Sequence, residues 1–300
     1  MSDLNKDRVV IITGAGGGIG RQHALAFAET GAKIVVNDLG GDMHGGGRDD
    51  HPAQETAAMI RDMGGEAVVN GGNVANFDDA KAMIAQAIDT FGRLDVLVNN
   101  AGILRDRMLT NMEENEWDSV IAVHLKGTFA PTRHAVAYWR DQAKAGNQPD
   151  ARVINTTSPS GIFGNVGQTN YGAAKAGIAT FSIIAGLELA RYGVTVNAIA
   201  PVARTRMTEN LGMTKPEDDA QFDALDPANI SPLVVWLGSP ESKDVTSQVF
   251  LVAGDRIGVA EGWHRGPTAE NEGLRWDPNT LGKVVPDLVT QARKSAGMFE

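Results

Sequence analysis

Val9-Val10-Ile11-Ile12-Thr13 followed by Gly14-Ala15-Gly16-Gly17-Gly18-Ile19-Gly20 is the stretch of sequence that decides the fold. The first five residues are apolar and β-branched, as in a buried strand, and the glycines open a helix predicted over 18–30. Glycines between a strand and a helix let the backbone approach a pyrophosphate, whose charge is met by the helix N-terminus. The stretch therefore predicts a dinucleotide-binding βα unit.

Alternating strands and helices continue from this unit to about residue 255. Strands are predicted at 33–38, 67–70, 94–99, 152–157, 194–199 and 248–252, and helices at 52–63, 77–91, 117–144 and 172–191. Repeated βα units predict one α/β domain, a Rossmann-type, doubly wound parallel sheet. We expect a catalytic domain over 1–255 and a C-terminal extension over 256–300 that packs on the same domain or on a partner subunit. The irregular segments 40–51 and 201–227 are typical of lids or binding loops.

Composition narrows the function classes. The 300-residue chain is 42% hydrophobic and 21% charged, which is ordinary for a globular protein. A net charge of −10 argues against sequence-independent nucleic-acid binding. The chain has no cysteine, which excludes disulfides, thiol catalysis and thiolate metal sites. With a polar amino terminus and no apolar run of about 18 residues, we expect a cytoplasmic protein without a membrane span.

Asp38 is the candidate cofactor-selecting residue. It ends the second predicted strand, eighteen residues after Gly20. A carboxylate there can accept hydrogen bonds from both ribose hydroxyls of NAD and repels the 2′-phosphate of NADP. Arg48, in the following loop, is the nearby residue that would soften this exclusion, and a helix or turn cap is the alternative role for Asp38. The expected cofactor is NAD.

Tyr171 and Lys175 share one face of a predicted helix because they are four residues apart. An ammonium within about 4–6 Å favours the phenolate and lowers the phenol pKa. Ser158, thirteen residues upstream at a strand end, is placed to hold a substrate oxygen while the phenol transfers a proton. Pro159 favours an extended Ser158, and spacing favours Ser158 over the rival hydroxyl of Ser160. On its own, such a pair is more often a surface helix contact than a site.

Together these elements resemble the short-chain dehydrogenase/reductase family over about residues 8–255. The matching pieces are the glycine turn, Asn99-Asn100-Ala101-Gly102, Ser158, and Tyr171 to Lys175. The resemblance implies seven parallel strands in the order 3-2-1-4-5-6-7, hydride exchange with a nicotinamide, and a homodimer or homotetramer. It implies that the cofactor is held by Gly14, Gly17, Gly18, Ile19, Gly20, Asp38, Asn73, Val74, Asn100, Ala101, Gly102, Tyr171, Lys175, Pro201 and Thr205.

Three positions depart from the family pattern. The family more often has Asp where Asn73 stands, and its Pro-Gly after the sixth strand is Pro201-Val202 here, which leaves Thr205 in place of the usual carboxamide-binding Thr. The family's catalytic Asn is replaced by His124, in Val123-His124-Leu125. His124 is either a fourth catalytic residue that passes a proton from Lys175 through water, or a neutral packed histidine.

Several stretches resemble more particularly the (3R)-hydroxyacyl-CoA dehydrogenases of peroxisomal multifunctional β-oxidation enzymes and their stand-alone bacterial relatives. This resemblance implies NAD-dependent oxidation of a 3-hydroxyacyl-CoA, fatty or steroidal, to the 3-oxoacyl-CoA. An NADPH-dependent 3-oxoacyl carrier-protein reductase is the alternative, which Asp38 argues against. A non-catalytic dinucleotide-binding scaffold is disfavoured by the set Ser158, Tyr171 and Lys175. The stretches concerned are 36–42, 100–107, 161–171, 199–201, 206–208 and 232–237.

Other constellations are weaker. His44 and His51 lie in the Gly-rich loop with Asp42, Asp49 and Asp50, but nothing in the sequence fixes their geometry, so no metal is expected. No G-x-S-x-G motif surrounds Ser158, which argues against a hydrolase. In the extension, packing or interface roles are predicted for Trp263, His264 and Trp276.

Overall fold

The computed structural model describes residues 3–42, 44–47, 49–205, 222–294 and 296–297. Two compact units make up the chain, Met1–Ala260 and Glu261–Glu300. Arg48 and the stretch 206–208, both singled out from the sequence, lie outside the described residues, as does most of the predicted loop over 201–227. The glycine turn, Asp38, Ser158, Tyr171 and Lys175 all belong to the first unit.

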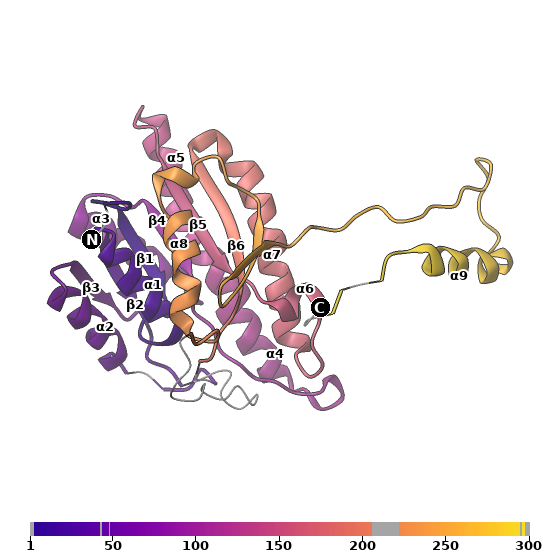
Figure 1. The fold of residues 1–300 in the computed structure, drawn as a ribbon, viewed down its shortest axis with the longest axis horizontal. Coiled ribbons are helices and arrows are strands. Elements are labelled where there is room, and N and C mark those ends of the chain that lie inside the picture. Colours follow the sequence, from indigo (N-terminus) through magenta and orange to yellow (C-terminus); the bar gives the residue numbers. More distant parts are fainter. Residues whose placement is uncertain (1–2, 43, 48, 206–221, 295, 298–300) are drawn as a thin grey trace. The chain divides into compact units, whose positions relative to one another are not determined.

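One sheet runs through the first unit in the order β3-β2-β1-β4-β5-β6-β7-β8 (Figure 1). The predicted parallel sheet and its order 3-2-1-4-5-6-7 are confirmed. Its parallel strands are β1 (Val9–Thr13), β2 (Lys33–Asn37), β3 (Glu66–Asn70), β4 (Val96–Asn99), β5 (Ala151–Thr156), β6 (Val194–Val202) and β7 (Val249–Ala253).

The predicted number of strands was one too few. An eighth strand, β8 (Arg256–Val259), pairs antiparallel with β7 after a two-residue turn at Gly254-Asp255. Gly254 has φ +55°, which suits the tight turn of a hairpin. All four residues of β8 are exposed at the edge of the sheet. The strand therefore lacks the burial pattern by which the others are recognised.

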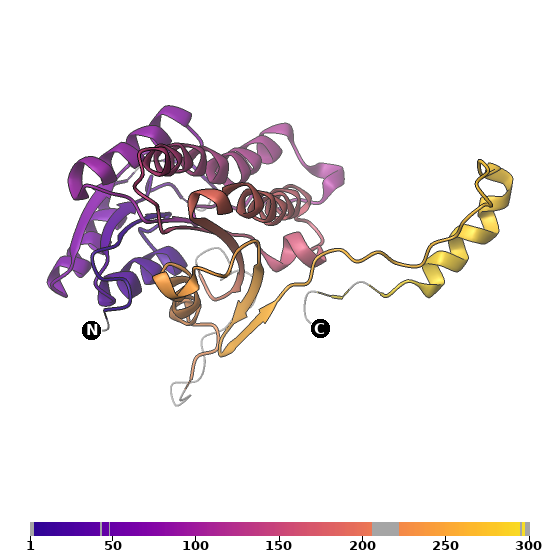
Figure 2. The ribbon, with the colours of Figure 1, turned by 90° about the horizontal axis from the view of Figure 1, so that it is seen from above.

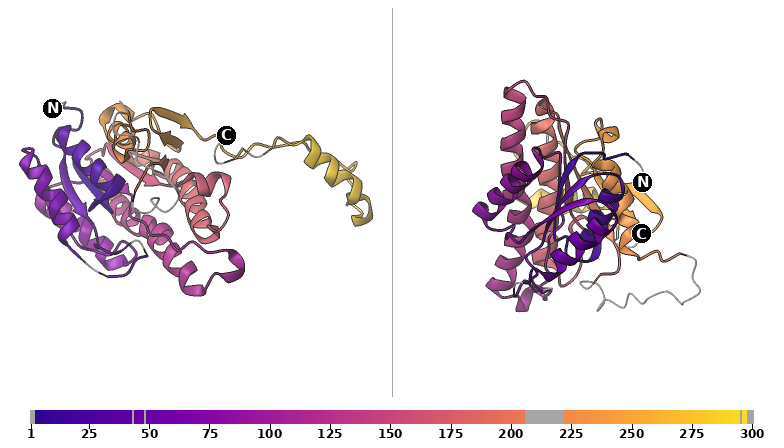
Figure 3. Two further views of the ribbon diagram at one scale, coloured as in Figure 1. Left: turned by 60° about the horizontal axis from the view of Figure 1, so that its bottom comes forward. Right: turned by 90° about the vertical axis from the view of Figure 1, so that its left-hand side faces the viewer.

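Helices cover both faces of the sheet (Figure 2, Figure 3). Val10 and Ile12 pack with α1 (Gly18–Glu29), α2 (His51–Asp62) and α8 (Ser231–Leu237). Val9 and Ile11 point the other way, towards α3 (Phe77–Phe91), α5 (Gly127–Lys144) and α7 (Thr169–Leu189). Because both faces are buried, the central strands carry apolar runs such as Val9 to Ile12 and Val96 to Val98.

Several helices and short helical turns differ from the predicted elements. The helix predicted at 117–144 begins earlier, as α4 (Glu114–Ile121), and continues into α5 through the π-helical turn η2 (Ala122–Lys126). Two further helices, α6 (Pro159–Phe163) and α8, were not predicted. Within the described part of the first unit, further single turns are η1 (Leu109–Asn111), η3 (Ala190–Tyr192), η5 (Pro227–Ile230) and η6 (Pro240–Ser242).

The helical stretch from Thr169 to Tyr192 is long and apolar enough to cross a membrane by length and composition, and is the one such stretch within the described ranges. It also carries Tyr171 and Lys175 and packs on the sheet through Ala185 and Leu189. These contacts are those of a core helix in a layered α/β domain.

The second unit contains η7 (Pro278–Thr280) and α9 (Leu281–Gln291). No residue of α9 is buried, and the side chain of Trp263 is fully exposed. The packing or interface role expected for Trp263, His264 and Trp276 stays a prediction.

Candidate active site

The turn after β1 is bound to the end of β4. Thr13 Oγ1 accepts hydrogen bonds from the backbone N–H groups of Asn100 (2.9 Å) and Ala101 (3.1 Å). The Nδ2 of Asn100 donates to the carbonyl oxygens of Thr13 (3.1 Å) and Gly14 (3.2 Å). A Cβ on Gly20 would lie 2.1 Å from the Gly14 oxygen, so a side chain there would push the helix off the turn. The structure thus brings together four of the predicted cofactor residues.

The first turn of α1 presents backbone donors at the same edge. Gly17 is the N-cap residue, and no side chain caps the helix. The first N–H groups of a helix have no partner within the helix, so here they stay available to an anion. Ile19, also predicted here, packs its side chain against the core beneath. The methyl group of Thr205 lies beside this turn, 3.6 Å from where a Cβ on Gly18 would be.

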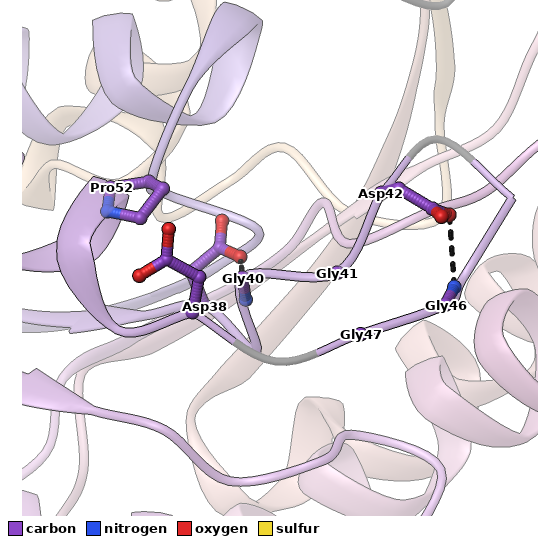
Figure 4. Close-up of a pocket in the computed structure, with 8 residues that line it drawn as sticks. Asp38, Gly40, Gly41, Asp42, Gly46, Gly47 and Pro52 are labelled. Carbon is purple, nitrogen blue, oxygen red and sulfur yellow. Dashed lines mark hydrogen bonds between the residues drawn. The ribbon is translucent and has the colours of Figure 1, made fainter.

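Asp38 directly follows β2 and binds two loops. One carboxylate oxygen accepts from the backbone N–H of Gly16 (2.7 Å) and the other from that of Gly40 (2.7 Å; Figure 4). Asp38 therefore does act as the turn cap that was weighed as its alternative role. Each carboxylate oxygen can accept a second hydrogen bond, so the capping role leaves capacity for ribose hydroxyls.

A cavity of about 390 Å³ opens beside Asp38. Its lining combines three aspartates and a proline with four glycines, whose missing side chains leave room for a ligand close to the backbone (Figure 4). A Cβ on Gly16 would lie 2.7 Å from Asp38 Oδ2. The lining residues are Asp38, Gly40, Gly41, Asp42, Gly46, Gly47, Asp49 and Pro52.

The Gly-rich loop is ordered by its own side chains. Asp42 Oδ1 accepts from the N–H groups of His44 (2.8 Å) and Gly46 (2.9 Å), and these bonds lower the pKa of the Asp42 carboxyl. His44 Nδ1 lies 3.0 Å from the Leu104 oxygen, and Arg105 Nε donates to the His44 oxygen (2.9 Å). These groups build a turn and dock the loop on the segment after β4. Across the described part of the chain, no three His, Asp or Glu side chains are placed to hold a metal ion.

Ser158 stands at the end of β5 and caps α6. Its φ of −159° and ψ of 151° are extended, as Pro159 predicts, and its Oγ accepts from the Ser160 N–H (3.1 Å). A Cβ on Gly161 would lie 2.6 Å from the Ala176 nitrogen, so α6 lies directly against α7. The side chain of Ser158 hydrogen-bonds with that of Tyr171, whereas Ser160 Oγ donates to Gln168 (2.8 Å). The hydroxyl beside the phenol is thus that of Ser158.

Tyr171 and Lys175 share one face of α7, with Lys175 Nζ 5.4 Å from the centre of the phenol ring. Lys175 is 3% exposed, donates to the Thr156 oxygen (2.6 Å), and burial lowers its pKa to about 7. Desolvation raises the pKa of Tyr171 to about 12, although the hydrogen bond with Ser158 lowers it. The direction is opposite to that predicted from the ammonium, because loss of hydration is the largest influence on the phenol.

His124 lies in η2 with its ring edge-on to Tyr171, 5.1 Å between ring centres. Its Nε2 contacts both the nitrogen (3.1 Å) and the oxygen (2.8 Å) of Ile103. Burial and the nearby Lys175 hold the pKa of His124 well below its ordinary value. A Cβ on Gly102 would lie 2.4 Å from the ring, so Gly102 makes room for it. This geometry favours the neutral packed histidine.

Three further predicted residues lie at the ends of strands. Asn73 Oδ1 accepts from the Ala75 N–H (2.9 Å) in the turn before α3. The side chain of Val74 is buried, 2.7 Å from where a Cβ on Gly127 would be. Pro201 pairs with Val252, so β6 extends beyond its predicted end.

A family model of short chain dehydrogenases matches residues 8–216, which include the glycine turn, Ser158, Tyr171 and Lys175. The chain belongs to the short-chain dehydrogenase family. A crystal structure of a short-chain dehydrogenase from Mycobacterium avium is 54% identical, covers 98% of each chain and superposes with a TM-score of 0.88.

Two similar proteins of known name fall within a smaller part of this family. A protein of Mycobacterium tuberculosis named hydroxyacyl-CoA dehydrogenase ChsB1 is 42% identical over 93% of this chain and 88% of its own length. The peroxisomal multifunctional enzyme type 2 of Mus musculus is 44% identical over 93% of this chain. This chain spans 34% of that longer enzyme. The sequence resemblances drawn from the motifs therefore hold over nearly the whole chain.

Sequence reasoning missed several residues that hold the site of this short-chain dehydrogenase together. Asn170 is fully buried, accepts from the Tyr171 N–H (2.7 Å), and donates to the Arg105 oxygen (2.9 Å) and the Glu116 oxygen (3.1 Å). Gln168 is buried as well. The available signal was two amides directly before the tyrosine, since buried amides need partners.

Proposed function

We propose that the protein is an NAD-dependent dehydrogenase that oxidises the 3-hydroxyl group of a 3-hydroxyacyl-CoA to a ketone. The observation that carries the proposal is the arrangement of Ser158, Tyr171 and Lys175 at the end of β5 and the start of α7. The name of the M. tuberculosis relative, which matches along 88% of its length, supports the substrate class.

The residues present fit a dinucleotide. The glycine turn and the uncapped start of α1 offer backbone N–H groups for a pyrophosphate, and Asp38 offers acceptors for a ribose beside the cavity. When bound, NAD⁺ supplies the acceptor for the hydride. The Asp38 carboxylate argues for NAD, because a 2′-phosphate would bring two negative charges together in a partly buried place.

The chain's own residues supply the proton chemistry. The Ser158 hydroxyl holds the substrate oxygen, and the Tyr171 phenolate removes the proton of the substrate hydroxyl. Because the pKa of Tyr171 is raised to about 12, the phenol needs added positive charge nearby to ionise at neutral pH. Lys175, buried one helical turn away, is the residue placed to provide it once protonated. By resemblance to the family, Lys175 would also bind the ribose of the nicotinamide nucleotide.

A substrate and cofactor panel tests the proposal. Purified protein is assayed with NAD⁺ and NADP⁺ against the 3R and 3S forms of short, long and steroidal 3-hydroxyacyl-CoAs, with Tyr171→Phe as the matched control. We expect NAD⁺ reduction with the 3R thioesters and none by the variant. Reduction of NAD⁺ with other alcohols but with no 3-hydroxyacyl-CoA would refute the substrate class. A preference for NADPH and 3-oxoacyl carrier protein would instead identify the reductase.

We also propose that the protein is a homodimer or homotetramer that pairs through α7. Ile184 and Leu187 are 50% and 72% exposed on its outer surface, beside Ile183. Contiguous apolar side chains on a helix surface indicate a protein interface. At the start of α7, the small exposed side chain of Ala173 would also permit close packing, whereas Ala174 is buried within the protein.

A further inference from the structure

Asp106 lies in the segment after β4, and this segment is fastened to the loop before α7. The Arg107 N–H donates to the Gly167 oxygen (2.8 Å), and Asn170 Nδ2 donates to the Arg105 oxygen (2.9 Å). Between these contacts, Asp106 Oδ2 accepts from Gln168 Nε2 (2.7 Å). Three hydrogen bonds therefore fix the segment that carries the Asp106 carboxylate to the start of the helix that bears Tyr171.

Gln168 continues the connection to the other catalytic element. Its side chain is buried, and its Oε1 accepts from Ser160 Oγ (2.8 Å). The Ser160 N–H in turn donates to Ser158 Oγ (3.1 Å). A chain of hydrogen bonds thus runs from Asp106 through Gln168 and Ser160 to the hydroxyl that meets the phenol. The chain of hydrogen bonds joins the segment after β4, the loop before α7 and the start of α6, and an isolated parallel bridge between Arg107 and Gln168 lies beside it.

The charges around Tyr171 are few. Lys175 approaches from α7, but burial lowers its pKa to about 7; His124 approaches from η2 and is neutral, because burial keeps its pKa well below the ordinary value. Glu116 on α4 is neutralised by the Arg107 guanidinium at 3.1 Å. Asp106 is the carboxylate whose charge acts on the phenol, and it raises the pKa of Tyr171. Partial desolvation raises the pKa of Asp106 itself, while the Gln168 amide favours its ionised form.

We propose that Asp106 is a positioning residue for the dehydrogenase reaction, whose negative charge opposes ionisation of Tyr171 and whose hydrogen bonds through Gln168 and Ser160 hold Ser158 beside the phenol. The inference rests on the proposed function for its kinetic consequence. Its two parts are separable, because charge and hydrogen bonding can be removed independently at this site.

The first experiment removes only the charge. In Asp106→Asn the amide oxygen still accepts from Gln168, so the hydrogen-bond chain stays intact. We expect the acid limb of the pH profile of kcat/KM for alcohol oxidation to move to lower pH by about half a unit to one unit, the size of effect that removing one nearby negative charge has in a partly polar medium. Asp106→Ser, a second charge-removing variant, should show the same direction. Asp118→Asn, which removes an exposed carboxylate on neighbouring α4, is the matched control and should show no shift.

The second experiment breaks the chain but keeps the charge. Gln168→Leu should lower kcat by tenfold or more, because Ser160 and Ser158 lose their support, without moving the pH profile to lower pH. A purely structural role for Asp106 predicts lowered activity in both variants and no shift in either. That result, or an Asp106→Asn profile that superimposes on the wild type or moves to higher pH, overturns the proposal.

A readout without substrate separates this inference from the proposed function. Ultraviolet difference titration of the phenolate, with Tyr171→Phe subtracted, follows Tyr171 directly in the folded protein. Its rise should begin at lower pH in Asp106→Asn than in the wild type. If no 3-hydroxyacyl-CoA is oxidised, the proposed substrate class fails, and this titration still decides the role of Asp106: coincident curves refute it.

Discussion

Lys175→Met should make the protein inactive and more stable. The pKa of Lys175 falls from its ordinary value of 10.5 to about 7 because the ammonium is buried. Between these values the unfolded chain binds a proton that the folded protein does not, so the free energy of unfolding rises as pH rises. Linkage gives a gain of about 2 kcal/mol between pH 7 and pH 9. Methionine has no charge to titrate, so the variant should lack this slope.

The magnitude at neutral pH follows from the same shift. At pH 7 the unfolded chain binds the Lys175 proton more tightly than the folded protein does, and this difference lowers the free energy of unfolding of the wild type by about 4 kcal/mol. Methionine has a similar shape and no proton to lose, so the variant does not suffer this loss of stability. It does lose the hydrogen bond to the Thr156 oxygen, which lowers its free energy of unfolding by about 1 kcal/mol. The variant should therefore be more stable by about 3 kcal/mol at pH 7, and by about 1 kcal/mol at pH 9.

Urea unfolding at pH 7, 8 and 9, at one fixed protein concentration, measures these differences. Lys144→Met, which removes an exposed lysine on α5, is the matched control and should run parallel to the wild type. An equal stability difference between Lys175→Met and the wild type at pH 7 and at pH 9 would show that the burial of Lys175 carries no proton linkage, and would refute this prediction.

Three further outcomes are expected. Tyr171→Phe should lower kcat by on the order of a thousandfold with intact NAD binding, measured by steady-state kinetics and calorimetry; an active variant would restore the scaffold hypothesis. Asp38→Asn should raise the kcat/KM ratio of NADP⁺ to NAD⁺ about tenfold and lower the melting temperature, because one of the N–H groups of Gly16 and Gly40 loses its acceptor; an unchanged ratio contradicts the selecting role. Leu187→Glu should lower the molar mass in light scattering, and a monomeric wild type would dispose of the proposed oligomer.

The sequence predicted the parallel frame well because the central strands are buried on both faces and contain apolar runs, as in β1 and β4. The sequence did not predict elements that are exposed or too short to show a hydrophobic pattern. In β8 the side chains of Ile257 and Val259 are 60% and 54% exposed, so nothing distinguishes them from loop residues. The five residues of α6 are too few to show a helical period. The π-helical turn η2 leaves the surrounding helical pattern unbroken and adds one residue within it.

The catalytic trio was predictable because its members stand on elements of fixed direction: a strand end and one face of a helix. Their electrostatics were not. That Lys175 Nζ turns to the Thr156 oxygen, and that Gly102 admits the ring of His124, depends on how loops pack after the strands end. Sequence spacing indicates which residues meet, while loss of hydration decides the direction of the pKa shifts of Tyr171, Lys175 and His124.

A comparison of two buried basic residues, Arg152 and Lys175, shows why Lys175 belongs to a functional site. Arg152, 1% exposed at the start of β5, is paired with the Asp150 carboxylate and also donates to Ser239 and Ser242. Within the described residues no carboxylate pairs with Lys175, which donates to a single backbone oxygen. A folded chain loses stability by burying a cation without its counter-charge, and structural sites avoid it. Such a cation is retained where chemistry needs it, at the end of the sheet opposite to Arg152, beside Tyr171 and Ser158.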